Sequence, residues 1–163
     1  MRRILIASLS AAALIAPVFL GVAPASAAPD KDLKLKCVSS DPEDVVVVSE
    51  TNTVTITDDP STGGNNFGCY TNLAVMTGDI VTFDYTGVDC GGGVPRVFFN
   101  FNGGKSENTF DSNPTCSGPV PGTITYTLVN SGRIKSFAFI NDRGDGSTVT
   151  YSNLVINGTR IDF

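Results

Sequence analysis

Hydrophobic and polar residues alternate with a period of two in several segments of the chain. In residues 79–86, for example, Val81, Phe83 and Tyr85 fall on one face, and polar residues fall on the other. Such alternation is typical of a half-buried β-strand with one face in water. No segment after residue 27 shows the sustained period of an amphipathic helix. The pattern therefore predicts an all-β fold.

Turn signals divide the chain into short runs rich in Val, Ile, Thr, Tyr and Phe, separated by clusters of Gly, Asn, Asp and Pro. The expected strands are 44–49, 53–58, 69–75, 79–86, 96–101, 122–128, 134–141, 148–156 and 159–163. Asn157-Gly158 predicts a tight hairpin turn before the last of them. About nine strands at this spacing predict an antiparallel β-sandwich, jelly-roll-like in topology, that forms a single domain over residues 44–163.

Residues 134–140 depart from simple alternation because both faces of the predicted strand are apolar. Phe137 and Phe139 share one side, while Ala138 and Ile140 share the other. We expect a central strand whose second face is covered by a loop. The alternative is an exposed aromatic platform for a ligand.

Residues 1–27 have the features of a cleavable signal peptide. A positive Arg2-Arg3 pair precedes a largely apolar run, and Ala25-Ser26-Ala27 is a small-x-small cleavage pattern. A membrane-spanning helix is the alternative for the apolar run. We expect cleavage after Ala27, a flexible lead-in over residues 28–43, and a secreted, extracellular protein without membrane attachment after cleavage.

The composition excludes several classes of function. The chain has 163 residues with no His and no Trp, and its formal net charge is −5. Without His there is no Ser-His-Asp or Cys-His nucleophile and no His-ligated zinc or copper. An acidic chain does not suit the phosphates of nucleic acids, so we expect no nucleic-acid partner. The oligomeric state stays open at this point.

Four cysteines in a chain with an export signal predict two disulfides. Four cysteines allow three connectivities. We favour Cys37–Cys69 and Cys90–Cys116, because pairing between neighbours closes the shortest loops. Metal binding by four thiolates is the alternative, but the spacing lacks the C-x-x-C pattern of such sites.

Two loops rich in Asn, Asp and Gly, residues 100–111 and 141–147, are the candidate ligand-binding segments. The candidate residues, chosen for their amide and carboxylate groups, are Asn102, Asn108, Asp142 and Asp145. The last two are also candidate calcium ligands, although Asp-Gly turn chemistry accounts for their loop without a metal. We expect no cofactor, with calcium as the alternative.

Carboxylates are the acid-base groups that a chain without His can offer. The candidates for a two-carboxylate glycosidase are Asp84, Asp89, Glu107 and Asp111, which lie near one another in sequence. Because Asp residues on the polar faces of strands are usually solvated, we favour a non-catalytic protein.

The segment Cys90-Gly91-Gly92-Gly93-Val94-Pro95-Arg96 is interpreted as a tight crossing before a strand. It does not complete a phosphate-binding loop, because no helix and no Gly-Lys-Ser/Thr sequence follow. We expect the Arg96 guanidinium to pair with Asp84 or Asp111.

This segment, together with Cys116 and the closing strand 152–158, resembles small secreted β-sandwich proteins of actinobacterial type whose function is unassigned. The general pattern over residues 78–163 is similar to that of jelly-roll carbohydrate-binding modules. The resemblance implies an exported, non-catalytic binding or cell-envelope-associated domain whose partner is a polysaccharide or envelope glycan. Such modules usually display Trp or paired Tyr, so the missing Trp predicts binding through hydrogen bonds and not through stacking. The alternatives are a secreted two-carboxylate hydrolase and a small extracellular protease inhibitor.

Overall fold

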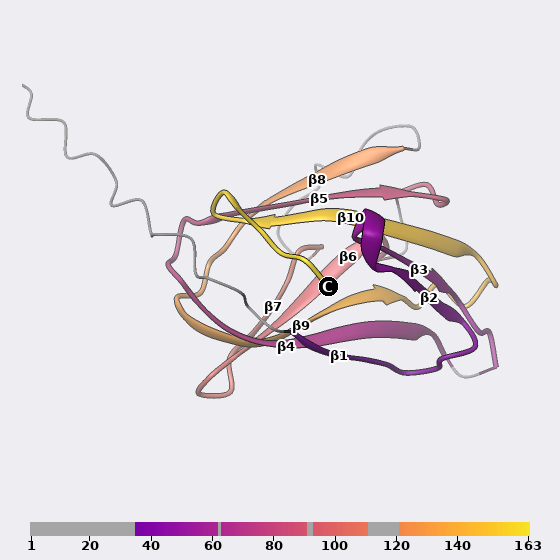
Figure 1. Ribbon diagram of the computed structural model, residues 1–163, viewed down its shortest axis with the longest axis horizontal. Helices are drawn as coiled ribbons and strands as arrows, with labels where there is room; N and C mark the ends of the chain where they lie inside the picture. Colours follow the sequence, from indigo (N-terminus) through magenta and orange to yellow (C-terminus); the bar gives the residue numbers. More distant parts are fainter. Residues whose placement is uncertain (1–34, 62, 91–92, 111–120) are drawn as a thin grey trace, which may run out of the picture. The chain divides into compact units, whose positions relative to one another are not determined.

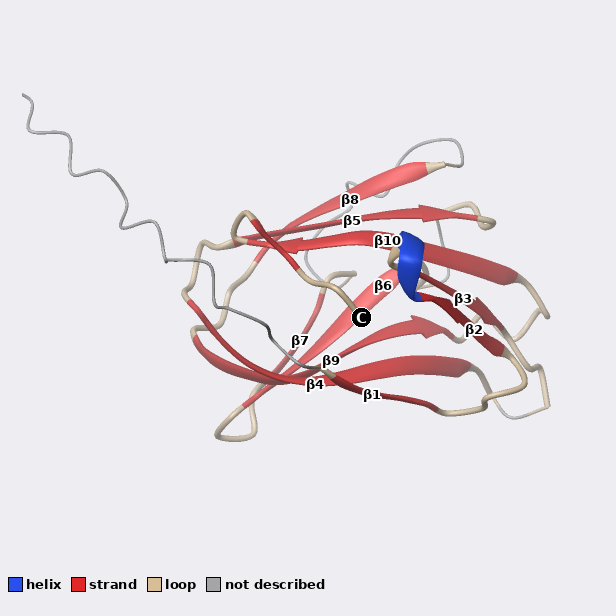
Figure 2. Cartoon of the chain, viewed as in Figure 1, coloured by secondary structure: helices blue, strands red, loops and turns tan. Residues whose placement is uncertain are grey.

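The computed structural model describes residues 35–61, 63–90, 93–110 and 121–163. The predicted signal peptide, residues 28–34 of the predicted lead-in, and Cys116 lie outside these residues. The described part consists of strands and turns, with one short 3₁₀ segment, η1 (Ser49–Thr51) (Figure 2). It contains no helix of the length and apolarity needed to cross a membrane.

Two antiparallel sheets form the layers of a β-sandwich (Figure 1). The first sheet has five strands in the order β1-β4-β9-β6-β7. Their bounds are β1 Lys36–Ser39, β4 Asn65–Val75, β9 Gly132–Asn141, β6 Arg96–Phe101 and β7 Ser106–Asn108.

The second sheet has six strands, five of them in the order β2-β3-β10-β5-β8, with β11 paired to β10. Their bounds are β2 Val45–Val48, β3 Thr53–Thr57, β10 Thr148–Ile156, β5 Ile80–Thr86, β8 Gly122–Thr127 and β11 Thr159–Arg160. The predicted hairpin turn is confirmed, because Ile156 pairs with Thr159 and both Asn157 and Gly158 have positive φ. The predicted all-β sandwich is confirmed, with eleven strands in the described residues where about nine were expected.

The core lies between the sheets and is built from the inward residue of each alternating pair. Val81, Phe83 and Tyr85 of β5 are no more than 3% exposed, as their alternation predicted. Aromatic rings join the two layers, since the Phe139 ring of β9 lies 4.9 Å from the Tyr151 ring of β10. The expectation of a central strand at 134–140 is confirmed, because β9 lies third in its five-stranded sheet.

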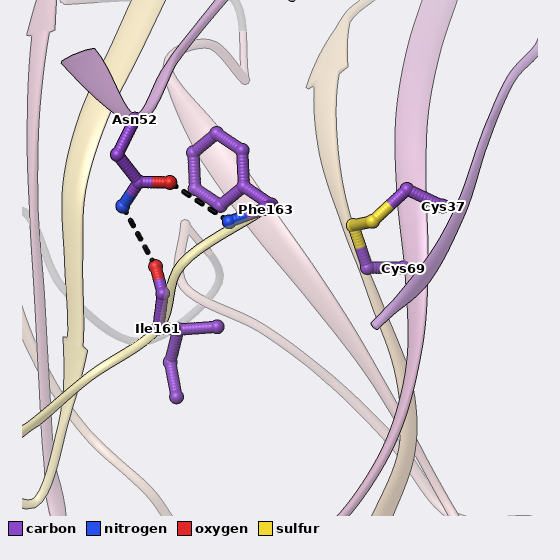
Figure 3. The surroundings of a disulfide bond; sticks show 5 residues. All are labelled: Cys37, Asn52, Cys69, Ile161 and Phe163. Carbon is purple, nitrogen blue, oxygen red and sulfur yellow. Dashed lines mark hydrogen bonds between the residues drawn. A yellow bond between two sulfur atoms is a disulfide. The ribbon is translucent and has the colours of Figure 1, made fainter. Parts of the chain in front are cut away.

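β1 lies inside the segment for which we expected a flexible lead-in. Lys36–Ser39 pairs with β4 over four positions, and Cys37 forms a disulfide with its direct register partner Cys69 (Figure 3). The covalent bond and the backbone ladder together hold this short polar strand at the sheet edge. The predicted Cys37–Cys69 pairing is confirmed, whereas Cys90–Cys116 stays a prediction because Cys116 is outside the described residues.

The strand β7 was also missed, because Ser-Glu-Asn has none of the β-branched or aromatic residues that mark strands. It forms because the chain turns back on β6, so that Asn100 pairs with Ser106 and Phe98 with Asn108. Tertiary pairing has overridden weak local propensity here.

The C-terminal residues connect the two sheets close to the disulfide (Figure 3). The buried side chain of Asn52, just after η1, donates a hydrogen bond to the Ile161 carbonyl and accepts one from the Phe163 N–H, both at 2.8 Å. The Phe163 ring packs against Phe67 of β4 and Phe139 of β9. One amide from the six-stranded sheet thereby positions an aromatic ring on the five-stranded sheet.

Candidate functional site

A groove of about 520 Å³ lies on the outer face of the five-stranded sheet, where β4, β9 and β6 run side by side (Figure 1). Cys69, Phe99 and Phe137 point into the core, so the residues that alternate with them face outward. The lining residues with polar side chains are Tyr70, Asn100, Asn102, Lys105, Lys135 and Ser136. The volume falls within the roughly 300–1,000 Å³ that is usual for small-ligand sites.

Strand pairing places four outward residues in one row across the sheet. Tyr70 of β4 pairs with Ser136 of β9, which in turn pairs with Asn100 of β6. Lys36 of β1 is the partner of Tyr70 on its other side. The Asn100 side-chain amide donates a hydrogen bond to the Ser136 hydroxyl at 3.3 Å. The row therefore presents ammonium, phenol, hydroxyl and amide groups side by side.

An irregularity in β9 shapes the middle of the groove. The register of β9 shifts against both β4 and β6 between Ile134 and Ser136. As a result, Lys135 and Ser136 both lie outward, between the buried residues Ile134 and Phe137. β-Bulges commonly redirect side chains in this way near functional sites.

The turn between β6 and β7 contributes the remaining lining residues. The Phe101 N–H donates to the Lys105 carbonyl at 2.9 Å, and the Asn102 N–H donates to the Arg133 carbonyl at 2.9 Å. Gly103 and Gly104 have φ values of 90° and 82°, a region that glycine adopts without a steric penalty. These contacts fix the backbone from which Asn102 and Lys105 reach the groove.

Sequence reasoning missed Tyr70 of the groove, as it missed Lys135 and Ser136. The Tyr70 side chain is 50% exposed, whereas the other tyrosines, Tyr85, Tyr126 and Tyr151, are buried. The signal was present, because Tyr70 alternates with the buried residues Phe67 and Cys69 and so falls in the outward register of β4. An exposed ring on a sheet can pack against the apolar face of a ligand.

Of the four predicted ligand residues, only Asn102 lines the groove. Asn108 is half-buried on β7. It lies two residues after Ser106, which is the register partner of Asn100. The Asn108 side-chain oxygen accepts a hydrogen bond from the Phe110 N–H at 3.1 Å. Asn108 therefore stabilises the turn that follows β7.

Asp142 lies in the connection between β9 and β10, at the opposite end of β9 from the groove. Six residues of extended chain separate it from Ser136, which corresponds to roughly 20 Å. Its carboxylate forms an ion pair with Arg96, the residue for which Asp84 or Asp111 was the expected partner. Asn102, at the tip of the first predicted loop, and Asp142, in the second, thus lie toward opposite ends of β9.

Asp145, in the same connection, is also held by local partners. Its Oδ1 accepts a hydrogen bond from the Ser147 N–H at 2.9 Å, and its Oδ2 lies 3.2 Å from Arg143 Nε. The nearby Ser147 side chain, the hydrogen bond from the Ser147 N–H and the Arg143 charge lower the pKa of Asp145. Within the described ranges, no group of three or more His, Cys, Asp or Glu side chains is placed to hold a metal. Calcium binding at Asp142 and Asp145 stays the untested alternative to a domain without a cofactor.

The carboxylates proposed for a glycosidase do not form a pair in the structure. Asp84 lies on the outer face of the six-stranded sheet, between the buried residues Phe83 and Tyr85 of β5. Glu107 is 6% exposed and points between the sheets, where its Oε1 accepts a hydrogen bond from the Tyr126 hydroxyl. The six-stranded sheet separates the two groups, so they cannot face a common cleft.

The remaining two candidate carboxylates are Asp89 and Asp111. Asp89 is exposed in the loop after β5, and its backbone carbonyl accepts a hydrogen bond from Arg143 Nη1 at 2.9 Å. Asp111 lies outside the described residues.

The chain matches no protein-family model and none of the curated proteins. Solved structures with a similar fold include a mutant of a family 29 carbohydrate-binding module in complex with cellulohexaose, with a TM-score of 0.51 and 12% identity over 77% of this chain and 82% of that chain. A further mutant of that module, in complex with mannohexaose, has a TM-score of 0.50 and 11% identity over 81% of this chain and 87% of that chain. These similarities establish the fold as the jelly-roll β-sandwich of carbohydrate-binding modules. The narrower resemblance to actinobacterial-type secreted proteins stays a prediction.

Proposed function

We propose that the chain is a non-catalytic carbohydrate-binding domain that holds a polysaccharide segment in the groove on the five-stranded sheet. The observation that carries the proposal is the half-exposed Tyr70 ring in a groove that is also lined by the side-chain amides of Asn100 and Asn102. A sugar ring has an apolar face and a rim of hydroxyl groups. The Tyr70 ring packs against the apolar face, and the amides donate to and accept from the hydroxyls.

The position of the groove on a sheet favours binding with little reorganisation. Tyr70, Asn100 and Ser136 lie on paired strands, which hold side chains more rigidly than loops do. Each neutral hydrogen bond contributes about 0.5–1.5 kcal/mol net. With one aromatic ring, the expected dissociation constants lie roughly in the micromolar to millimolar range.

The similar solved structures support this proposal, since two of them are modules in complex with hexasaccharides, cellulohexaose and mannohexaose. Cellulohexaose and mannohexaose are ligands of those modules. They indicate that sugar chains are a suitable first panel for this chain.

The proposal places the domain outside the cell or at the cell envelope. The signal-peptide pattern of residues 1–27 supports export. The Cys37–Cys69 disulfide fits an oxidising compartment, where such bonds persist. The partner is then an extracellular or envelope polysaccharide.

Calorimetric titration of the mature protein with cellohexaose, mannohexaose and a soluble polysaccharide panel tests the proposal. We expect at least one of these ligands to bind, and we expect Tyr70→Ala to raise the dissociation constant of that ligand about tenfold. The matched control is Val46→Ala, which truncates a 58% exposed apolar side chain on the six-stranded sheet. Melting curves of both variants establish that they are folded.

Three results would contradict the proposal. If no sugar in the panel binds, the ligand is not a carbohydrate of these classes. If Tyr70→Ala binds sugar with unchanged affinity, the groove is not the binding site. If the protein hydrolyses any sugar in the panel, it is a hydrolase and not a non-catalytic binding domain.

A further inference from the structure

Charge is distributed unevenly between the two sheets. The five strands of the groove-bearing sheet contain one carboxylate, Glu107, whose side chain points into the interior. The same strands and the turn between β6 and β7 carry five cationic residues, which are Lys36, Arg96, Lys105, Arg133 and Lys135. The groove therefore lies on a cationic face of a chain whose formal net charge is −5.

The three lysines of this face differ from Arg96 of the same sheet in their ion pairing. Within the described part of the chain, the ion pairs are Arg96–Asp142, Arg143–Asp145 and Arg160–Asp162. Lys36, Lys105 and Lys135 take part in none of these pairs. Lys105 and Lys135 line the groove, and Lys36 is the register partner of Tyr70. The lysine charges around the groove are therefore available to a ligand.

This arrangement has a direct chemical consequence. A lysine ammonium is a compact charge with three donors, and its hydrogen bonds to carboxylate oxygens are stronger than those between neutral groups. Among the residues that the structure describes, none in the groove lining is a carboxylate that would repel an anion or compete for Lys105 and Lys135. A ligand with negative charges gains interactions here that a neutral sugar chain cannot make.

We propose that the groove selects acidic polysaccharides, in which uronate carboxylates occur along the sugar chain, over neutral ones. This inference rests on the proposed function, because Tyr70 and the amides of Asn100 and Asn102 hold the sugar rings while Lys105 and Lys135 contact the carboxylates. The groove is a limited cationic area on an otherwise acidic chain. It suits a ligand with one carboxylate per sugar better than a densely charged nucleic acid, which the rest of the surface repels.

Titration with hexagalacturonate and with cellohexaose, at 50 mM and 500 mM NaCl, tests the inference. We expect hexagalacturonate to bind about tenfold more tightly at low salt, and this preference to shrink at high salt. The double variant Lys105→Gln/Lys135→Gln loses the preference, because its affinity for hexagalacturonate falls by more than its affinity for cellohexaose. Arg160→Gln is the matched control, because it removes an exposed cation on β11 of the other sheet.

The outcomes separate the inference from the function on which it rests. If Tyr70→Ala weakens sugar binding but the double variant binds hexagalacturonate like the unmodified protein, the inference is wrong and the carbohydrate-binding function stands. If hexagalacturonate, cellohexaose and every other sugar of the panel fail to bind, both the inference and the proposed function are wrong. If polyphosphate or single-stranded DNA binds as tightly as hexagalacturonate, the lysines form a general polyanion site and the selection of acidic sugars is overturned.

Discussion

The buried carboxylate of Glu107, on β7 of the five-stranded sheet, accepts a hydrogen bond at 2.8 Å from the hydroxyl of Tyr126, on β8 of the six-stranded sheet. The N–H groups of Val129 and Asn130 donate to the same carboxylate at 2.6 and 3.0 Å, and the Asn130 side chain donates at 3.1 Å. The carboxylate is thus enclosed by donors from the opposite layer. Glu107, considered in sequence as a catalytic acid, links the two sheets.

Replacing this carboxylate should destabilise the fold. Glu107→Ala removes the acceptor of hydrogen bonds from the Tyr126 hydroxyl and from the part-buried N–H groups of Val129 and Asn130. A hydrogen bond to a charged group contributes about 1.5–3 kcal/mol. We expect a loss of about 2–5 kcal/mol in the free energy of unfolding, measured by urea denaturation. Glu50→Ala, in the exposed η1 segment, is the control and should change it by less than about 0.5 kcal/mol. Equal midpoints for the two variants would show that the carboxylate does not join the sheets.

Disulfide formation is a second test of the fold. The Cys37–Cys69 bond closes a loop with a sequence separation of 32 residues, so its removal should destabilise the protein by about 3.5 kcal/mol through the unfolded chain. The double variant Cys37→Ala/Cys69→Ala, compared with the oxidised parent by denaturation, measures this loss.

Peptide mass mapping without reduction should also recover the predicted Cys90–Cys116 pair. A free thiol at Cys90, or a peptide that joins Cys37 to Cys116, would contradict the pairing.

Alkaline pH should unfold the protein partly through Tyr151. Its buried hydroxyl donates to the Ile140 carbonyl and accepts from the Arg96 N–H, and burial raises the pKa of Tyr151 far above its usual value. In the unfolded chain this phenol titrates near pH 10, so its contribution to stability is complete below that pH and is lost as the pH rises further. The unfolding free energy should fall by about 1.4 kcal/mol per pH unit from this group above about pH 10.

The variant Tyr151→Phe isolates this effect. It loses the hydrogen bonds at every pH, but it should show a shallower decline in stability between about pH 9 and pH 11. Urea titrations at several pH values give both slopes. If the unfolding free energies of the two proteins decline with pH at the same slope, groups other than Tyr151 cause the loss of stability at alkaline pH.

Chelation of calcium should leave the melting temperature unchanged. Asp142 already pairs with Arg96, and Asp145 with Arg143, so both predicted ligands have cationic partners. Scanning calorimetry with excess EDTA, and then with added calcium, measures the effect. A stabilisation that grows with calcium concentration would instead support metal binding at these residues.

Export should remove the segment before Ala28. The Ala25-Ser26-Ala27 pattern predicts an N-terminus at Ala28, or within a residue or two of it, in protein recovered from culture medium. N-terminal sequencing determines this position. Intact chain in the membrane fraction is the opposing result.

The fold class could be predicted from the sequence because alternation is a local property. Val81, Phe83 and Tyr85 occupy every second position, and a strand turns that spacing into one buried face whatever its neighbours are. The Asn157-Gly158 turn is local in the same sense, since two residues that tolerate positive φ are sufficient for a tight hairpin. Neighbour pairing of Cys37 with Cys69 followed from loop length.

The site, by contrast, depends on which strands become neighbours. Tyr70, Asn100 and Ser136 are distant in sequence and meet because β9 inserts between β4 and β6. The same strand order places the turn at residues 102–105 beside the start of β9 and the connection at residues 142–147 after its end, although both looked in sequence like one group of polar loops. It also places a sheet between Asp84 and Glu107. The local pattern of a strand specifies which side is apolar, but long-range pairing and register decide what that side faces and which residues share its surface.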